Sequence, residues 1–145
     1  MRLSTKGRYG VRLMLELAHH YGKGAVLLKT IAETQQISEK YLWHLIVPLR
    51  AAGLISTKRG VHGGYTLAKP PSQITLKEIV EVLEGPMSLV ECVKFPSVCE
   101  RSAFCAARDV WVKLSEKLME TLGSITLEDL ANSQRKKLSD NLHKM

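Results

Sequence analysis

The chain has 145 residues, 45% hydrophobic and 24% charged, a size and mixture that fit one globular domain and exclude a disordered or collagen-like chain. No stretch approaches the roughly 20 apolar residues of a membrane helix, and Arg12 and Glu16 break the apolar run that a signal peptide needs, so we expect a cytoplasmic protein. Residues 1–69 hold 11 basic and 3 acidic side chains, whereas residues 70–145 hold 10 and 11. Nucleic acid is therefore the expected partner of the first half, although an anionic membrane surface would fit the charge alone.

Three amphipathic helices are predicted in the first 53 residues. Apolar side chains at helical spacing indicate helices over 8–21 and 28–35. After a short turn at 36–37, Ser38 is a suitable N-cap for a third helix, and Gly53 is a suitable C-cap. The inward face of this third helix is predicted to consist of Leu42, Leu45, Ile46 and Leu49.

A β-hairpin is predicted next, because the β-prone runs 54–58 and 65–67 flank the glycine-rich stretch 59–64. Thr75 and Glu78 then form a capping box for a helix that ends at Gly85-Pro86. We assign residues 1–86 to one winged-helix unit.

The second half divides into three parts. Residues 87–105 lack a clear period and are predicted to be a cysteine-bearing loop with a sensor role. Residues 106–134 are expected to hold dimerisation helices: one over 106–122, then a short one that Thr126 caps and that runs through Ala131. The polar stretch 135–145 is expected to be a flexible tail.

Two short helices, a tight turn and a basic hairpin are typical of a winged helix-turn-helix, so the fold class is mainly α with a small two-stranded β wing. The start of the third helix would enter the major groove of DNA, and an arginine on a slim loop suits the minor groove. Each residue alone has a plainer interpretation, for example a helix cap or a solvated turn. The candidate DNA-binding residues are Ser38, Lys40, Tyr41 and His44 on the helix, with Lys58, Arg59 and His62 on the wing.

An apolar stripe runs along the helix predicted over 106–122, at Ala107, Trp111, Leu114, Leu118 and Leu122. Its steps of three and four residues are those of a short coiled-coil seam. Covering the chain's own core is the alternative. We favour a homodimer, because the winged unit closes with its own helices, and a dimer would bind a palindromic DNA site.

All three cysteines, Cys92, Cys99 and Cys105, fall within 14 residues. The spacing is neither that of a zinc site nor a CxxC redox motif. It leaves three interpretations open: a polynuclear metal cluster, buried structural cysteines, or a thiol switch without metal.

Four stretches resemble the Rrf-two family of bacterial transcription regulators: MRLSTKGRYGVRLMLELA, ISEKYLWHLIVPLRAAGL, KRGVHGGYTLAKP and ITLKEIVEVLEGP. The resemblance runs over residues 1–131, and the wing pattern KRG-x-x-GGY-x-L is specific. It implies a DNA-binding regulator. In members with a cysteine triad it implies an iron–sulfur cluster on Cys92, Cys99 and Cys105, with 2Fe-2S favoured and 4Fe-4S possible.

The chain departs from those members at the fourth cluster ligand. Arg108 stands where one type has a ligating histidine, and Arg8 stands where another has an acidic residue. The fourth ligand is left open among Asp109, Glu100, His44 of the partner subunit, an external thiol and water.

The expected function is therefore a homodimeric transcription regulator, expected to repress, whose DNA binding is tuned by an iron–sulfur cluster that senses iron–sulfur, redox or nitric oxide status. The first alternative is a cluster-free winged-helix regulator of cysteine or sulfur metabolism that is switched by thiol chemistry or a partner protein. The second is a small electron carrier, against which the chain has no nucleotide-binding glycine motif and no nucleophile–base pair. We expect no enzymatic activity.

Overall fold

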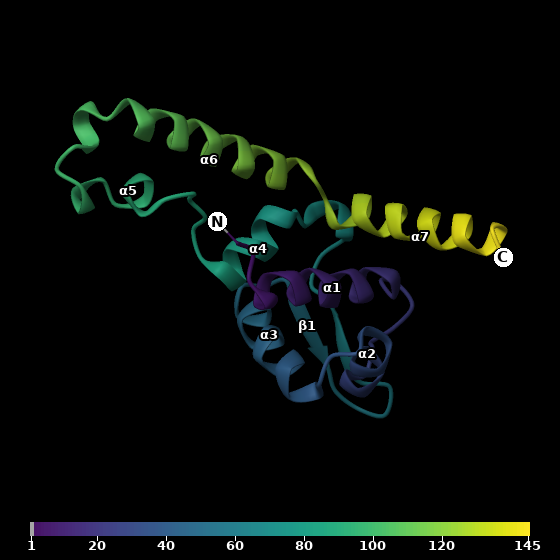
Figure 1. Cartoon of the computed structure of the whole chain (residues 1–145). Helices are drawn as coiled ribbons and strands as arrows, with labels where there is room; N and C mark the ends of the chain where they lie inside the picture. Colours follow the sequence, from purple (N-terminus) through teal and green to yellow (C-terminus); the bar gives the residue numbers. More distant parts are fainter. Residues whose placement is uncertain (1) are drawn as a thin grey trace.

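The computed structural model describes residues 2–145, which form a mainly helical winged helix-turn-helix with two long C-terminal helices (Figure 1). In Figure 1 the first four helices and the hairpin pack together, and the last two helices run along one side of them. Among the described residues, no helix is long and apolar enough to cross a membrane. The main elements are α1 (Thr5–His19), α2 (Leu28–Gln35), α3 (Glu39–Ala51), β1 (Ile55–Lys58), β2 (Gly64–Leu67), α4 (Leu76–Glu84), α5 (Glu91–Lys94), α6 (Ala106–Ser124) and α7 (Leu127–His143).

The core lies among α1, α2, α3, α4 and the hairpin. The predicted inward face of α3 is confirmed, because all four of its apolar residues are fully buried. They pack with buried residues of α1 and α4 in one cluster. The first helix begins earlier than the sequence predicts, at Thr5, because the Ser4 hydroxyl caps it.

A glycine sets the distance between α1 and α4. A Cβ atom on Gly10 would lie 1.9 Å from Cδ1 of Leu83 on α4, which no real contact allows. The missing side chain therefore lets the two helices approach closely at this point.

Glu84, the last residue of α4, holds the first turn of α1. Its Oε1 atom accepts hydrogen bonds from the backbone N–H of Ser4 (3.0 Å) and of Gly7 (3.1 Å). A carboxylate at this place accepts hydrogen bonds from free amides at the helix start and is attracted by the partial positive charge of the helix N-terminus. The end of the winged unit is thus fastened to its beginning.

The structure corrects two predictions for the second half. Residues 87–105 are not a plain loop, since they contain α5 and two single turns of 3₁₀ helix, Pro96–Val98 and Ser102–Phe104. The helix capped by Thr126 does not end at Ala131 but continues to His143. No Gly or Pro follows Thr126, so nothing stops the helix where its apolar pattern ends.

The stretch 135–145, expected to be a flexible tail, is therefore helical as far as His143, and every one of its side chains is exposed. On α6 the predicted seam is also largely uncovered: Trp111 and Leu114 are 39% and 47% exposed. The buried residue of α6 is Ser115, which accepts a hydrogen bond from Leu89 N–H at 3.2 Å. The face of α6 toward its own chain thus combines this polar contact with half-buried apolar residues such as Val112 and Met119, whereas Trp111 and Leu114 point away from it.

Candidate nucleic-acid interface

The turn between α2 and α3 is tight because of one backbone conformation. Gln36 follows α2 with a φ of 55°, in the left-handed region that non-glycine residues rarely adopt. The next amide, that of Ile37, donates to the carbonyl of Ala32 at 3.1 Å, and the Ile37 side chain is buried. The turn fixes the angle at which α3 leaves α2.

The start of α3 presents polar groups to solvent. The Ser38 hydroxyl oxygen accepts a hydrogen bond from Tyr41 N–H at 3.1 Å, which caps the helix as predicted. Ser38, Lys40 and His44 are all exposed. Because the opposite face of α3 is buried, these side chains are held on one outer surface with free helix-start amides beside them.

Tyr41 is half-buried and differs from its neighbours. Its ring packs edge-on against Tyr9 of α1, with centroids 5.8 Å apart and planes at 85°. The guanidinium of Arg8 lies 5.9 Å from the Tyr9 ring centroid and is exposed. Arg8 is therefore a basic group next to the start of α3 that the sequence reasoning missed, although its place near Tyr9 in a basic helix could have suggested it.

The wing is an antiparallel hairpin anchored at its base. Ile55 of β1 pairs with Leu67 of β2, and both side chains are buried. A second anchor is the pair of 2.8 Å backbone hydrogen bonds between Val26 and Tyr65. Gly64 is required there, because a Cβ atom on it would lie 2.5 Å from the Val26 carbonyl oxygen and its φ is +148°.

At the free end of the wing, the predicted DNA-binding residues Lys58, Arg59 and His62 are exposed, and Val61 is almost completely exposed. The turn is closed by a hydrogen bond from Gly63 N–H to the Gly60 carbonyl at 3.0 Å. A slim loop with two cations at its tip is a shape that fits the minor groove.

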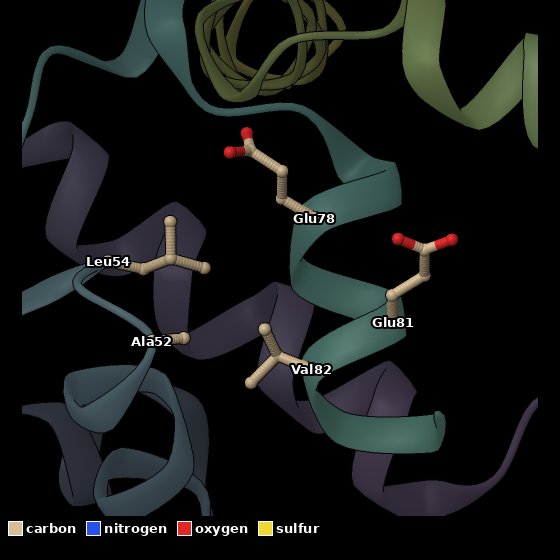
Figure 2. A pocket seen from close by; sticks show the side chains of 5 residues that line it. All are labelled: Ala52, Leu54, Glu78, Glu81 and Val82. Atoms are coloured by element: carbon tan, nitrogen blue, oxygen red, sulfur yellow. The ribbon is translucent and has the colours of Figure 1, made fainter. Parts of the chain in front are cut away.

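Carboxylates gather at a different place. A pocket of about 290 Å³ between the end of α3 and α4 is lined by Ala52, Leu54, Glu78, Glu81 and Val82 (Figure 2). The Glu78 carboxylate forms a 3.0 Å ion pair with Lys69, and hydrogen bonds to it from Thr75 and Lys69 outweigh burial, so the pKa of Glu78 is lowered. A phosphate would be repelled here, so the acidic pocket stands apart from the candidate interface.

The cysteines lie on the other half of the molecule. Cys92 is in α5 and Cys105 directly precedes α6, and both are half-buried, whereas Cys99 between them is exposed. Arg108 of α6 donates from Nε to the Cys92 carbonyl oxygen at 3.1 Å, and so fastens α5 to α6. Arg108, at the position where some members of the family have a cluster-ligating histidine, thus links α5 to α6.

The structure does not bring the three cysteines together. All three thiols are free, and residues 2–145 contain no group of three His, Cys, Asp or Glu side chains arranged to hold a metal ion. The arrangement of donors seen here therefore does not fit a bound iron–sulfur cluster.

Comparisons with known proteins identify the family of the chain. The model of the Rrf2 family, described as "Iron-dependent Transcriptional regulator", matches residues 3–133. The HTH-type transcriptional regulator CymR of Bacillus subtilis (strain 168) is 46% identical over 132 residues, which are 91% of each chain. The HTH-type transcriptional regulator IscR of Photorhabdus laumondii is 39% identical over 92% of this chain and 81% of its own.

Solved structures give the same result for the fold. The structure of CymR, the global cysteine regulator of B. subtilis, has a TM-score of 0.79 at 45% identity and covers 92% of this chain and 98% of its own. T. potens IscR has a TM-score of 0.77 at 42% identity, with 92% and 88% covered. A regulator rather than an enzyme or an electron carrier is therefore the established class, and the chain belongs to the Rrf2 family of DNA-binding transcription regulators.

Proposed function

We propose that Ser38, Lys40 and His44 read the major groove, that Tyr41 donates to a phosphate from the edge of this surface, and that Lys58, Arg59 and His62 enter the minor groove. The observation that carries this proposal is the exposed, basic surface shared by the start of α3 and the tip of the wing. Figure 1 places both on the side of α1 that is turned away from α6 and α7. Phosphate contacts would set the register, and base contacts would give the sequence preference.

The active form is a homodimer on a palindromic site. The apolar face of α6, which includes Val110, Trp111 and Leu114, is exposed in the single chain. Large apolar side chains in a contiguous exposed row are typical of an interface. Pairing through α6 would place one α3 helix from each subunit on the DNA. The half-sites that such dimers bind lie about 34–36 Å apart.

For the signal, the favoured proposal is a cluster-free regulator of cysteine or sulfur metabolism, switched at its cysteines by thiol chemistry or by a partner protein. Two observations support it: the likeness to a regulator described as the global cysteine regulator, and the separated free thiols, of which Cys99 is exposed. An exposed thiol is open to oxidation and exchange, whereas a buried one is not.

An iron–sulfur cluster is the second candidate. The observation that favours it is the clustering of three cysteines within 14 residues, together with the likeness to T. potens IscR. Cys92, Cys99 and Cys105 would be the protein ligands, and a cluster would supply redox and sulfide chemistry. The segment 92–105 would have to rearrange first, since the thiols are apart.

Two experiments test DNA recognition and its effect on transcription, and a third one separates the two signals. Selection of bound duplexes from a random DNA pool should yield palindromes, and unselective binding would contradict the proposal. Transcription from a promoter with the selected site should fall when the protein is added, as expected for a repressor.

Protein purified without oxygen should then be colourless, free of iron and sulfide, and weakened in DNA binding when its thiols are alkylated. The Cys99→Ser variant should lose most of that response. Matched iron and sulfide in a brown protein would instead establish the cluster candidate.

A further inference from the structure

A cavity of about 480 Å³ lies between α1, α2 and α7, and it is separate from the candidate DNA-binding residues and from the cysteines. Its volume is in the range of small-molecule sites, which combine apolar walls with a few polar groups. The cavity is lined by Arg12, Leu15, Glu16, His19, Thr34, Gln35, Gln134 and Leu138.

A buried carboxylate forms part of the wall. Glu16 is only 6% exposed, and its oxygens contact Gln35 Nε2 at 2.8 Å and His20 Nε2 at 3.2 Å. Within residues 2–145, its ion-pair partner is the imidazole of His20, which carries a positive charge only when protonated, and neither Lys nor Arg lies within ion-pair distance. Buried carboxylates are usually paired with a cation, because an uncompensated buried charge is costly.

A cation lines the same cavity one helical turn away. Arg12 donates from Nε to Gln35 Oε1 at 3.2 Å and from its terminal nitrogen to the Gln35 carbonyl, and its guanidinium lies 5.1 Å from the centroid of the Tyr9 ring. In the described part of the chain it forms no ion pair with a carboxylate. The Gln35 amide thus accepts from Arg12 and donates to Glu16. One neutral amide therefore lies between the Glu16 carboxylate and the Arg12 guanidinium, which do not pair with each other.

The other polar groups of the cavity do not supply the missing charge. Burial, and then the positive charge of Arg135, lowers the pKa of His19 from its ordinary value, which favours the uncharged imidazole. Thr34 and Gln134 are neutral hydrogen-bonding groups, and Leu15 and Leu138 form an apolar wall.

We propose that this cavity binds a free α-amino acid. Its ammonium group would meet Glu16, its carboxylate would meet Arg12, and its side chain would lie against Leu15 and Leu138. A zwitterion supplies a permanent cation for Glu16 and an anion for Arg12 at once, whereas a simple amine or acid supplies only one of them. Gln35 is the last residue of α2, directly before the turn into α3, so the ligand would join α7 to the helix-turn-helix.

Isothermal titration calorimetry of the full chain with each of the twenty standard L-amino acids, at millimolar concentration and without DNA, tests this proposal. At least one should bind saturably, with one molecule per chain. Its N-acetyl and carboxamide derivatives should each bind roughly tenfold more weakly or worse, because each lacks one of the two charges. The outcome does not depend on the proposed DNA contacts.

Two variants locate the site. Glu16→Gln keeps the shape and should weaken binding roughly tenfold or more, whereas Glu33→Gln, an equal change at an exposed position of α2, should not. Gln134→Trp should block the cavity from α7 without touching the core, and Ser133→Trp is its exposed control. The proposal is wrong if none of the twenty amino acids binds, or if the binder is unaffected by both Glu16→Gln and Gln134→Trp.

Discussion

The two halves of the chain solve different problems. Almost all buried apolar side chains lie in the winged unit, and beyond residue 84 they are Leu127 and Ala131. The second half instead carries exposed aromatic and aliphatic side chains, including Phe104, Trp111 and Leu142. The charge divides in the same way, with the whole positive excess before residue 70. The comparison shows a first half that holds nearly the whole core, completed by Leu127 and Ala131 of α7, and a second half that keeps much of its apolar surface exposed in the single chain.

The largest effect expected is on folding. Leu45→Ala removes a fully buried side chain of α3 and should lower the free energy of unfolding by about 2–5 kcal/mol. Leu142→Ala, the same change at a 72% exposed position of α7, should alter it by less than about 0.5 kcal/mol. Urea unfolding at one protein concentration measures both. Equal losses would break the distinction between the halves.

The next effect concerns assembly. Trp111→Ala should weaken the proposed dimer by about 2 kcal/mol, or roughly thirtyfold, because large aromatic side chains dominate interfaces. Trp43→Ala removes a similarly exposed tryptophan from α3 and should leave the dimer unchanged. Sedimentation equilibrium gives the two dissociation constants. A dimer that resists Trp111→Ala would mean that α6 is not the interface.

Removing a positive charge should lower DNA affinity when the charge lies in the first half of the chain, but not when it lies in the second half. Arg59→Ala on the wing should cost about 1–3 kcal/mol of binding to a selected site and change its sequence preference. Lys136→Ala removes an equal charge from an exposed position of α7 and should leave affinity nearly unchanged. Fluorescence anisotropy at fixed salt tests the pair, since affinities depend on ionic strength.

The smallest effect is a pH dependence within the winged unit. Burial raises the pKa of Glu78, but hydrogen bonds from Thr75 and Lys69 outweigh it and leave the pKa below its ordinary value of 4.5. The unfolded chain therefore binds more protons in that range, so this stabilisation is present above pH 4.5 and is lost as the pH falls through the folded-state pKa. Thermal unfolding should show Glu78→Gln less stable than the parent at neutral pH and equal to it in strong acid. A constant difference would contradict the assignment.

The sequence predicts the elements of the winged unit well because local signals define them. Ser38 and Thr75 cap the helices that they were expected to cap, and the hairpin lies within two residues of its predicted bounds. Such caps act over three residues, and a pattern of buried residues repeats within one helix. Both can be identified without knowledge of the fold.

What the sequence does not predict depends on distant contacts. The role of Gly10 depends on Leu83, and the place of Tyr41 depends on Tyr9. The polar half of α7 shows no apolar period, although it is helical. In the same way, the cavity beside Glu16 exists only because α7 lies across α1 and α2. The DNA contacts and the cysteine ligation remain predictions.

The hydrogen bonds between Glu84 and the first turn of α1 have a consequence for biosynthesis. Glu84 is 77 residues downstream of Gly7, and a ribosome delivers the chain from its N-terminus. The helix that is made first therefore lacks its distant carboxylate until α4 has emerged. Until then the Ser4 hydroxyl is the local cap of this turn, and the contact that joins the end of α4 to the start of α1 can form only after nearly the whole winged unit has been made.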